Sequence, residues 1–474
     1  MRPIFAIWIY WGAELRAFVF SGLARELARH GDLYVVSRVD PRELAPTCLP
    51  AGCRVLSAPA IRYPRGFAQL HSFANLAHGE WISRRYAGLA IRDQAAIGEP
   101  GENGAKRLRR RAGGILARSA MVRLLNRRLL RWGRKLAAVS GTLATEIPWC
   151  REGTLLTGDY LGVPGHLFAQ TAMAAGWRVC FYPLNWRDIS KGARIALPVT
   201  NLAVWDAPMK NLLFRNNPWL RKLPCRVVGS TQFDSHFRDD WILDRRDFCQ
   251  SLSIDPDRQI VCYSGVSDRA YQGEAAIVGL LAREIQAAGW ADRLQILVRL
   301  NPTASDPAYR EMAARWSPLV KLLAPEWDLR FADGSQPVWR SNTETDARLL
   351  ANLIRHTAVH VCLPSTMVLD FGVRGVPTVG IAFDADEPAG RRSLARDFAA
   401  QEIVRGAVAA GATRVADSPR TAVAGIVEAL AADAGARARL TGYVRDLVGA
   451  VPGTAHAALA AGMVADAEAP RCPR

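Results

Sequence analysis

The sequence lacks the glycine-rich fingerprints of two large classes of nucleotide-using enzymes. No GxxxxGK[ST] segment occurs in its 474 residues, and no GxGxxG follows the first apolar run, PIFAIWIY at 3–10. Such loops cradle phosphates in P-loop kinases and in dinucleotide-dependent dehydrogenases. The chain therefore gives no support to either activity.

Long apolar runs, repeats and clustered cysteines are missing as well. No run of about 18 apolar residues predicts a membrane-spanning helix, and no segment recurs at a fixed period. The nine cysteines include no CxxC pair and no neighbouring histidines that would complete a metal site. Three of them, Cys180, Cys262 and Cys362, lie in apolar runs, where cysteine acts as a small hydrophobic residue. The odd number and these positions favour a reducing compartment.

The apolar N-terminus does not have the features of a signal anchor. Glu14 and Arg16 interrupt it, no basic segment precedes it, and no small-residue cleavage site follows it. It predicts a strand over 3–10, a turn at Gly12 and an amphipathic helix that ends at Gly31. We therefore expect a cytoplasmic protein.

What the chain does contain is a regular alternation of short apolar runs with helical patterns, typical of α/β proteins with parallel sheets. The predicted strands are 3–10, 32–37, 53–59, 154–158, 177–184, 201–205 and 225–230 in the first half, and 259–265, 294–300, 320–324, 329–332, 358–363 and 377–383 in the second. Two such series predict two doubly wound Rossmann-like domains, over 1–240 and 241–450. A helical insertion is expected at about 60–150, mainly Ala-rich helix after Asp384, and a C-terminal helix and tail over 451–474.

One segment, LPSTMVLDFGVRGVP at 363–377, places Ser365 and Thr366 where a buried strand ends and a helix begins. A helix N-terminus has unpaired N–H groups and partial positive charge, so hydroxyls there either cap the helix or help to bind a phosphate. Asp370 is four residues after Thr366, on the same helix face. Asp370 either binds a ribose hydroxyl or is an ordinary acid in the first turn of a helix, and this segment alone leaves both interpretations open.

Three segments together resemble a known family. Residues 346–381 are similar to the C-terminal nucleotide-binding half of bacterial surface-polysaccharide glycosyltransferases with the GT-B fold, and LVRLNP at 297–302 looks like that family's Arg-x-His-Pro element, with Arg299 as the arginine. The histidine of this element is absent, because Leu300 and Asn301 occupy its place. Residues 185–234 resemble the end of the family's first domain and keep Trp186, Lys191, Gly192, Trp205, Gly229 and Asp234.

The resemblance implies a two-domain GT-B enzyme in which Ser365 and Thr366 hold the donor's phosphates and Asp370 its ribose. Arg299 and the pair Ser264–Gly265 are further candidates for the donor site. A surface ion pair for Arg299 and a plain turn for Ser264–Gly265 are the structural alternatives. Enzymes of this fold use no bound metal for transfer, so we expect no metal and no cofactor, with the nucleotide-sugar as a substrate.

An inverting transfer needs a general base for the acceptor hydroxyl. Glu14, in the loop after the first strand, is the first candidate, because several GT-B families have an acidic residue in this loop. Asp188 in NWRD and Asp159 after TLLTG are its rivals. For Glu14 the structural alternative is an acid in the first turn of a helix.

A basic segment, 106–136, contains no acidic residue, and the whole chain has a net charge of +17. Its apolar side chains and its arginines fall on opposite sides of a helix, so it predicts either a core-covering helix or one that lies on an anionic membrane. The same charge could also bind nucleic acid. No nucleic-acid-binding motif is present, however, so we expect no nucleic-acid partner.

The sequence thus predicts a glycosyltransferase that moves a sugar from a nucleotide donor to a bacterial surface polysaccharide or lipid-linked glycan. It would lie at the cytoplasmic face of the membrane, with 106–136 against the anionic surface. A CDP-glycerol-type glycerophosphotransferase, whose usual histidines are missing here, and a non-catalytic membrane- or nucleic-acid-binding scaffold are the alternatives.

Overall fold

The chain forms two compact units, each built around its own sheet. The structure, a computed structural model, describes residues 2–469 except 41–43, 45–48, 86–118, 140–145, 186–188, 190–192, 267–270, 272, 303, 305–306, 327–330, 332–342, 386–394, 397–401, 412, 432–433 and 450–452. The first unit comprises Met1–Asp234, Leu329–Ser341 and Val448–Arg474, and the second comprises Ser235–Asp328 and Asn342–Leu447.

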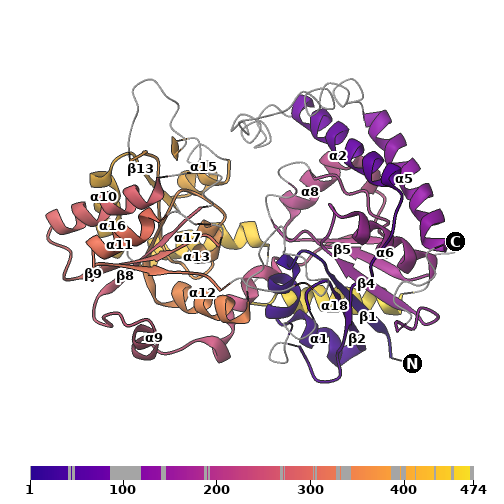
Figure 1. Ribbon diagram of the computed structural model, residues 1–474, viewed down its shortest axis with the longest axis horizontal. Coiled ribbons are helices and arrows are strands. Elements are labelled where there is room, and N and C mark those ends of the chain that lie inside the picture. Colours follow the sequence, from indigo (N-terminus) through magenta and orange to yellow (C-terminus); the bar gives the residue numbers. More distant parts are fainter. Residues whose placement is uncertain are drawn as a thin grey trace. The chain divides into compact units, whose positions relative to one another are not determined.

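In the described part of the first unit, seven parallel strands form a sheet in the order β3-β2-β1-β4-β5-β6-β7 (Figure 1). They are β1 (Ile4–Ile9), β2 (Asp32–Ser37), β3 (Arg54–Ser57), β4 (Gly153–Thr157), β5 (Arg178–Phe181), β6 (Asn201–Val204) and β7 (Cys225–Val227). β1 and β4 are buried along their whole length, as expected for central strands of a parallel sheet. The chain runs outward from β1 to β3 and then returns to β4, so the strand order reverses between β1 and β4.

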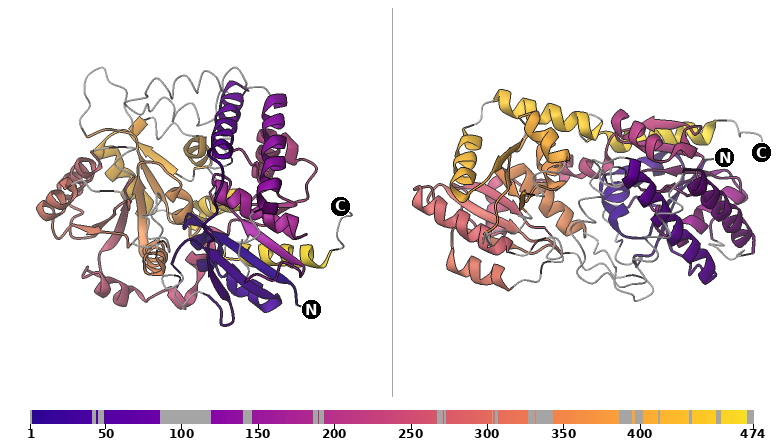
Figure 2. Two further views of the ribbon diagram at one scale, coloured as in Figure 1. Left: turned by 45° about the vertical axis from the view of Figure 1, so that its right-hand side comes forward. Right: turned by 90° about the horizontal axis from the view of Figure 1, so that it is seen from above.

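Helices cover both faces of this sheet. Right-handed crossovers from β1 to β2 and from β4 to β5 run in opposite directions, which places α1 (Leu23–His30) and α6 (Val163–Ala174) on opposite faces. The C-terminal helix α18 (Ala455–Glu468), yellow in Figures 1 and 2, packs on α1, β4 and β5. The predicted tail thus contributes a helix to the first unit. The remaining elements here are η1 (Leu15–Phe20), α8 (Ala207–Asn216), η2 (Pro218–Leu220) and η3 (Thr231–Phe237), which runs through the boundary between the units.

The insertion between β3 and β4 is helical in its described part, as predicted. It contains α2 (Arg65–Arg85) and α5 (Ser119–Val139), which pack on each other, and α5 also packs on α6. The apolar stripe of the basic segment is core: Val122, Leu125 and Leu129 are buried in one cluster with Phe67 and Trp81. The exposed basic residues of α5 are Arg123, Arg127, Arg128, Arg131, Arg134 and Lys135. The predicted part over 106–118 lies outside the described residues.

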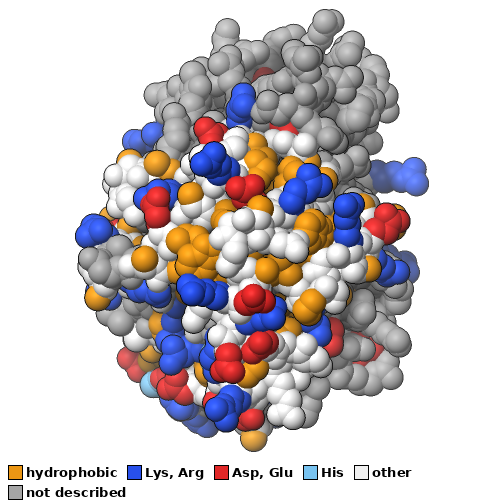
Figure 3. Space-filling model, turned by 90° about the vertical axis from the view of Figure 1, so that its left-hand side faces the viewer, with side chains coloured by type: hydrophobic (Ala, Val, Ile, Leu, Met, Phe, Trp, Pro, Cys, Tyr) orange, Lys and Arg blue, Asp and Glu red, His pale blue; other side chains and the backbone are white. Residues whose placement is uncertain are grey.

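The surface shown in Figure 3 does not have the one-sided basic charge of α5. In Figure 3, basic and acidic side chains are interspersed among apolar and neutral ones. The sequence of α5 (Ser119–Val139) has six basic and no acidic residues among its exposed positions. Of the described helices, none combines the length and apolar character needed to cross a bilayer.

The sheet of the second unit has the order β10-β9-β8-β11-β12-β13 in its described part, again all parallel. The strands are β8 (Gln259–Ser264), β9 (Leu294–Arg299), β10 (Val320–Leu323), β11 (Thr357–Cys362), β12 (Thr378–Ile381) and β13 (Thr413–Ala416). The helices are η4 (Asp239–Trp241), α9 (Arg245–Ser251), α10 (Glu274–Ala287), α11 (Ala308–Arg315), α12 (Glu344–His356), α13 (Met367–Gly372), α15 (Glu402–Ala409), α16 (Pro419–Leu430) and α17 (Ala434–Val448). The strand order reverses between β8 and β11.

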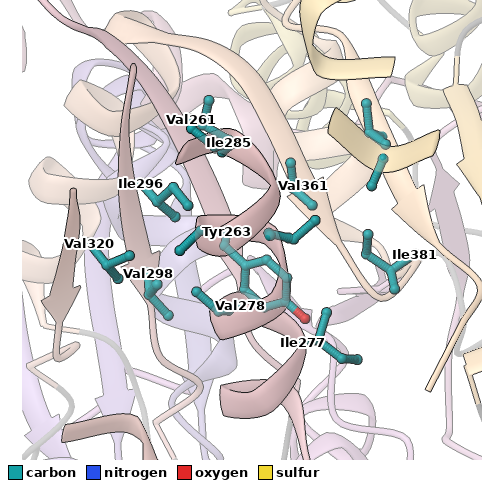
Figure 4. Close-up of a cluster of buried hydrophobic side chains, with 14 of the residues drawn as sticks. Val261, Tyr263, Ile277, Val278, Ile285, Ile296, Val298, Val320, Val361 and Ile381 are labelled. Carbon is teal, nitrogen blue, oxygen red and sulfur yellow. The ribbon is translucent and has the colours of Figure 1, made fainter. Parts of the chain in front are cut away.

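Alternating side chains of β8 build two core layers, one on each face of the sheet. Val261 and Tyr263 belong to the layer under α10, which Figure 4 shows together with Ile277 and Val278 of that helix. Ile260 and Cys262 belong to the opposite layer. This is the two-residue period of a strand with both faces buried.

The structure contains one strand that the sequence did not predict, and the predicted strand 329–332 lies mostly outside the described residues. The segment that forms β13 (Thr413–Ala416) was expected to be helical. β13 is a short edge strand, and because its two middle residues are exposed, it does not need the apolar run that marks a buried strand. In the predicted strand 329–332, Phe331 forms an isolated bridge with Val39, and its neighbours lie outside the described residues. The units divide after Asp234, where the sequence indicated a position near 240.

Candidate functional site

The first candidate site is the edge of the first sheet at which the strand order reverses, formed by the carboxyl ends of β1 and β4. Open α/β sheets bind ligands at such points, because the loops leave toward opposite faces. Glu14 lies in the first helical turn after β1, at the start of the helix that continues as η1, and Asp159 lies just after β4, which ends at Thr157. Two predicted catalytic carboxyls therefore come to one edge. The third, Asp188, lies outside the described residues.

Glu14 is completely buried and has no ion pair among the described residues. Its carboxyl accepts N–H groups of the backbone at Tyr10 (3.4 Å) and Trp11 (3.2 Å). The first distance exceeds the usual range of N–H···O hydrogen bonds, and the second lies at its upper end. Burial and the nearby charge of Asp159 raise the pKa of Glu14 from 4.5 to about 8. Glu14 therefore keeps its proton at neutral pH.

Asp159 is as deeply buried but has more donors. The indole N–H of Trp11 donates to Oδ1 at 2.9 Å and that of Trp8 to Oδ2 at 3.4 Å. Backbone N–H groups of Gly162 (2.8 Å) and Leu161 (3.2 Å) donate to Oδ1. Burial raises the pKa of Asp159, and the bonds from Trp11 and Gly162 oppose that rise.

The loop that leads into α6 is shaped by this carboxylate. A Cβ atom at Gly162 or at Gly165 would overlap the Oδ2 atom of Asp159. Glycine at both positions lets the backbone approach this carboxylate closely, and the N–H of Gly162 donates to it.

The second candidate site is the corresponding edge of the other sheet. Ser264 ends β8 and pairs in register with Arg299, which ends β9. The N–H of Gly265 donates to the Arg299 carbonyl at 3.0 Å. Ser365 and Thr366 follow the end of β11, the other neighbour of β8. The predicted donor-site residues thus gather at the carboxyl ends of three adjacent strands.

Arg299 has a partner that the sequence interpretation did not include. Its Nη2 donates to both oxygens of Asp346, at 2.8 and 2.9 Å, and both side chains are buried. Asp346 lies in the first turn of α12, where Thr343 caps the helix. This ion pair is buried, whereas the structural alternative stated for Arg299 was a surface ion pair. A phosphate contact for Arg299 stays a prediction.

Ser365 and Thr366 are both half-buried. The Ser365 hydroxyl accepts the N–H of Met367 at 3.3 Å, as in an ordinary helix cap, and Thr366 makes no capping bond. Part of each hydroxyl-bearing side chain is therefore open to solvent. Phosphate binding by this pair remains a prediction.

Asp370 is paired with a histidine from a distant part of the second unit. Its Oδ1 lies 2.9 Å from Nε2 of His236, and the side chains are 3% and 1% exposed. Arg374 donates to the His236 carbonyl from Nε and Nη2. The predicted ribose contact of Asp370 is thus in competition with a buried partner, and it also stays a prediction.

Ser264 likewise contacts a histidine that sequence reasoning missed. His360 has Nε2 3.1 Å from the Ser264 hydroxyl and Nδ1 3.0 Å from that of Thr378, and its ring stacks on Phe371. Burial lowers the pKa of His360 to about 3, so the ring is neutral. The signal in the sequence that could have identified His360 was its position as a lone histidine in the apolar run AVHV.

The other missed residues gave weaker signals. Trp8 and Trp11 look like apolar strand residues in sequence, and their indole N–H groups matter only because Asp159 lies opposite. His236 and Asp346 occupy a polar connection and a helix start, where such residues are common. In the described ranges, no group of three or more His, Cys, Asp or Glu side chains is arranged to hold a metal ion.

Comparison with known proteins gives structural but no sequence matches: no protein-family model matches the chain, and no curated protein matches it. The crystal structure of UDP-GlcNAc 2-epimerase from Neisseria meningitidis bound to UDP-GlcNAc is similar over 98% of this chain and 100% of that one, with a TM-score of 0.55 and 9% identity. A Listeria monocytogenes protein provisionally identified as a UDP-N-acetylglucosamine 2-epimerase is similar over 99% and 98%, with a TM-score of 0.54 and 10% identity. The chain has a GT-B fold. A Rickettsia africae glycosyltransferase is also similar over 98% of each chain, at a TM-score of 0.48 and 7% identity.

Proposed function

We propose that this protein is a glycosyltransferase that moves a sugar from a nucleotide-activated donor to a hydroxyl of a bacterial surface polysaccharide or lipid-linked glycan. The observation that carries the proposal is the pair of buried carboxyls, Glu14 and Asp159, at the reversal point of a sheet in a GT-B protein. Perturbed carboxyls at the ligand-binding edge of an α/β sheet are typical of catalytic sites.

The proposed reaction assigns Glu14 the role of general base. Ionised Glu14 takes the proton of the acceptor hydroxyl, and the acceptor oxygen forms a bond to the anomeric carbon of the sugar. The bond from that carbon to the donor's diphosphate oxygen breaks, and the diphosphate leaves with the electron pair. The second unit would bind the donor through Ser264, Gly265, Arg299, Ser365, Thr366 and Asp370. We propose no metal and no cofactor for this step.

A second candidate activity is epimerisation of a nucleotide-sugar. The Glu14–Asp159 pair favours it, because a protonated and an ionised carboxyl together can give and take a proton at a sugar carbon. The similar Neisseria and Listeria structures, each with a TM-score above 0.5, are both described as UDP-GlcNAc 2-epimerases, the second provisionally. Epimerisation would need no acceptor, which separates it from transfer.

The membrane location is a further part of the proposal. Exposed arginines of α5, with no acid on that helix, support contact with an anionic membrane surface, where a lipid-linked acceptor would lie. Nucleic acid is not proposed as a partner. A glycerophosphate transferase that uses CDP-glycerol and a non-catalytic scaffold are the remaining alternatives.

The testing experiment measures nucleotide binding and turnover separately. Thermal unfolding is followed with UDP, CDP, GDP, CMP and dTDP, because a ligand at 100 times its Kd adds about 2.7 kcal/mol to stability. The stabilising nucleotide is then offered as its sugar or glycerol derivative, with and without glycan acceptors. Release of nucleotide that depends on an acceptor supports transfer.

The outcomes separate the candidates. We expect Glu14→Gln to keep nucleotide binding and to lose transfer by about 10²- to 10⁴-fold, the usual contribution of a general base. An altered sugar formed without acceptor indicates an epimerase. Turnover of CDP-glycerol, with no turnover of any nucleotide-sugar, indicates the phosphotransferase. If no nucleotide raises the midpoint of unfolding, the proposed enzyme activity is wrong.

A further inference from the structure

One residue, Trp11, contacts both carboxyls of the first site. Trp11 donates its backbone N–H to Oε2 of Glu14 at 3.2 Å and its indole N–H to Oδ1 of Asp159 at 2.9 Å. Asp159 is 148 residues away in the sequence from Trp11, and the contact exists because β1 and β4 are neighbours in the sheet. Trp11 therefore links the two carboxyls directly.

The two carboxyls differ in how well their surroundings support a negative charge. Asp159 receives four N–H groups, two of them, from Trp11 and Gly162, at 2.9 and 2.8 Å. Glu14 receives backbone N–H groups at 3.2 Å and beyond. Hydrogen bonds to a carboxylate favour its charged form, and shorter bonds do so more strongly. The charge therefore belongs on Asp159 and the proton on Glu14.

Among the described residues, the other charged side chains near this edge contact other groups. Arg16, two residues after Glu14, donates to the Gln232 carbonyl and lies over the ring of Phe233. Arg38, which follows β2, lies over the Tyr10 ring. On α6, His166 is fully buried, and burial lowers its pKa to about 3, so it is neutral. The charge that acts on Glu14 from β4 is that of Asp159.

We propose that Trp11 is a positioning residue that makes Glu14 and Asp159 a pair holding one proton, with the proton on Glu14 and the charge on Asp159. The inference rests on the proposed function for its consequence in catalysis. The charge on Asp159 holds back the ionisation of Glu14, so the base becomes available only above neutral pH in the free enzyme. Two carboxyls whose charges interact titrate as a coupled pair, in two steps.

The test is a titration of the two carboxyl carbons by ¹³C NMR in the full-length protein, which does not depend on turnover. In the wild type, we expect Asp159 to ionise first and Glu14 to titrate near the pKa of about 8 given above. Asp159→Asn should lower the Glu14 midpoint by roughly one pH unit, because it removes a neighbouring like charge. Trp11→Phe should move the Asp159 step to higher pH, because the Asp159 carboxylate loses its shorter indole hydrogen bond. The Glu14 step should stay in place, because Asp159 is already ionised in the pH range in which Glu14 titrates.

Trp8→Phe is the matched control. It removes an indole N–H from the same carboxylate, but one at 3.4 Å in place of 2.9 Å, so the Asp159 step should move less than in Trp11→Phe. Thermal midpoints of all variants establish that they are folded. If Trp11→Phe is unfolded, the comparison of wild type with Asp159→Asn still tests the pair.

Three results would overturn the inference: Glu14 ionising before Asp159, a Glu14 step that Asp159→Asn leaves unmoved, or equal effects of the two tryptophan variants. Failure of the proposed function has a different signature. The NMR steps would then follow the expected order while no nucleotide-sugar is turned over.

Discussion

The two sheets carry buried acids at equivalent edges but in opposite electrostatic settings. In the second unit, Asp346 is bonded to the guanidinium of Arg299 and Asp370 to the imidazole of His236. In the first unit, Glu14 and Asp159 have neutral N–H donors and each other. A basic partner stabilises the ionised form of an acid, whereas burial beside a second acid stabilises the protonated form. The acids of the first unit are therefore the better candidates for proton transfer.

The same comparison explains which predicted roles the geometry supports most directly. Among the residues that the structure describes, Glu14 and Asp159 have no basic ion-pair partner, which suits the proposed catalytic pair. Arg299 and Asp370 already have buried partners, so a donor would have to be bound beside these pairs or in competition with them. Substitutions in the two units test this difference.

The largest effect is expected from Asp346→Ala. It leaves the Arg299 guanidinium buried without its carboxylate, which costs about 3–5 kcal/mol in the free energy of unfolding. Urea denaturation measures this loss. The control is Glu344→Ala on the same helix, whose pair with half-exposed Arg348 is worth about 0.5 kcal/mol or less. Equal losses in the two variants would contradict a structural role for the buried pair.

Glu14→Gln should raise the free energy of unfolding, in contrast to Asp346→Ala. Because the folded state raises the pKa of Glu14 from 4.5 to about 8, it binds this proton more tightly than the unfolded state, and wild-type stability falls as pH rises through that window. The glutamine variant avoids the loss, which amounts to on the order of a few kcal/mol by pH 8. Urea denaturation at pH 5, 6, 7 and 8 should show a growing advantage of the variant. Parallel curves would mean that Glu14 titrates normally.

Asp370→Asn separates the two interpretations of that residue. If the carboxylate also binds the donor, losing one charge-assisted hydrogen bond should weaken nucleotide binding roughly tenfold, measured by calorimetry with the stabilising nucleotide. Unchanged nucleotide affinity combined with a lower unfolding free energy would mean that Asp370 serves His236 alone.

The smallest effect concerns the basic face of α5. Arg127→Ala should weaken binding to vesicles that contain anionic lipids by about 1 kcal/mol, roughly fivefold, and the difference should shrink at high salt. Arg310 on α11, exposed in the second unit, is the matched control. Equal binding by the two alanine variants would remove the support for a membrane contact through α5.

Much of the fold follows from local pattern. All seven predicted strands of the first unit and five of the second are present, and α12 spans the predicted 344–356. The GT-B fold implied by the family resemblance is confirmed by structures that are 9% and 10% identical. The edge strand β13 was missed because its exposed middle residues leave no apolar run.

The candidate site was predictable only as a set of positions. That Glu14 and Asp159 follow strands can be read from their neighbours in sequence. That the two strands are adjacent depends on the order 3-2-1-4, which a series of strand–helix units does not specify.

By itself, the sequence determined the periodicity of its strands and helices, the surplus of basic charge and the acids that follow the strands, because these are properties of neighbouring residues. Tertiary structure alone decided the partners: Trp11 with Asp159, Arg299 with Asp346, and His236 with Asp370. Each pair joins residues that are far apart in the chain and meet through sheet order and helix packing. Which acid is neutralised and which keeps a proton is therefore set by the fold.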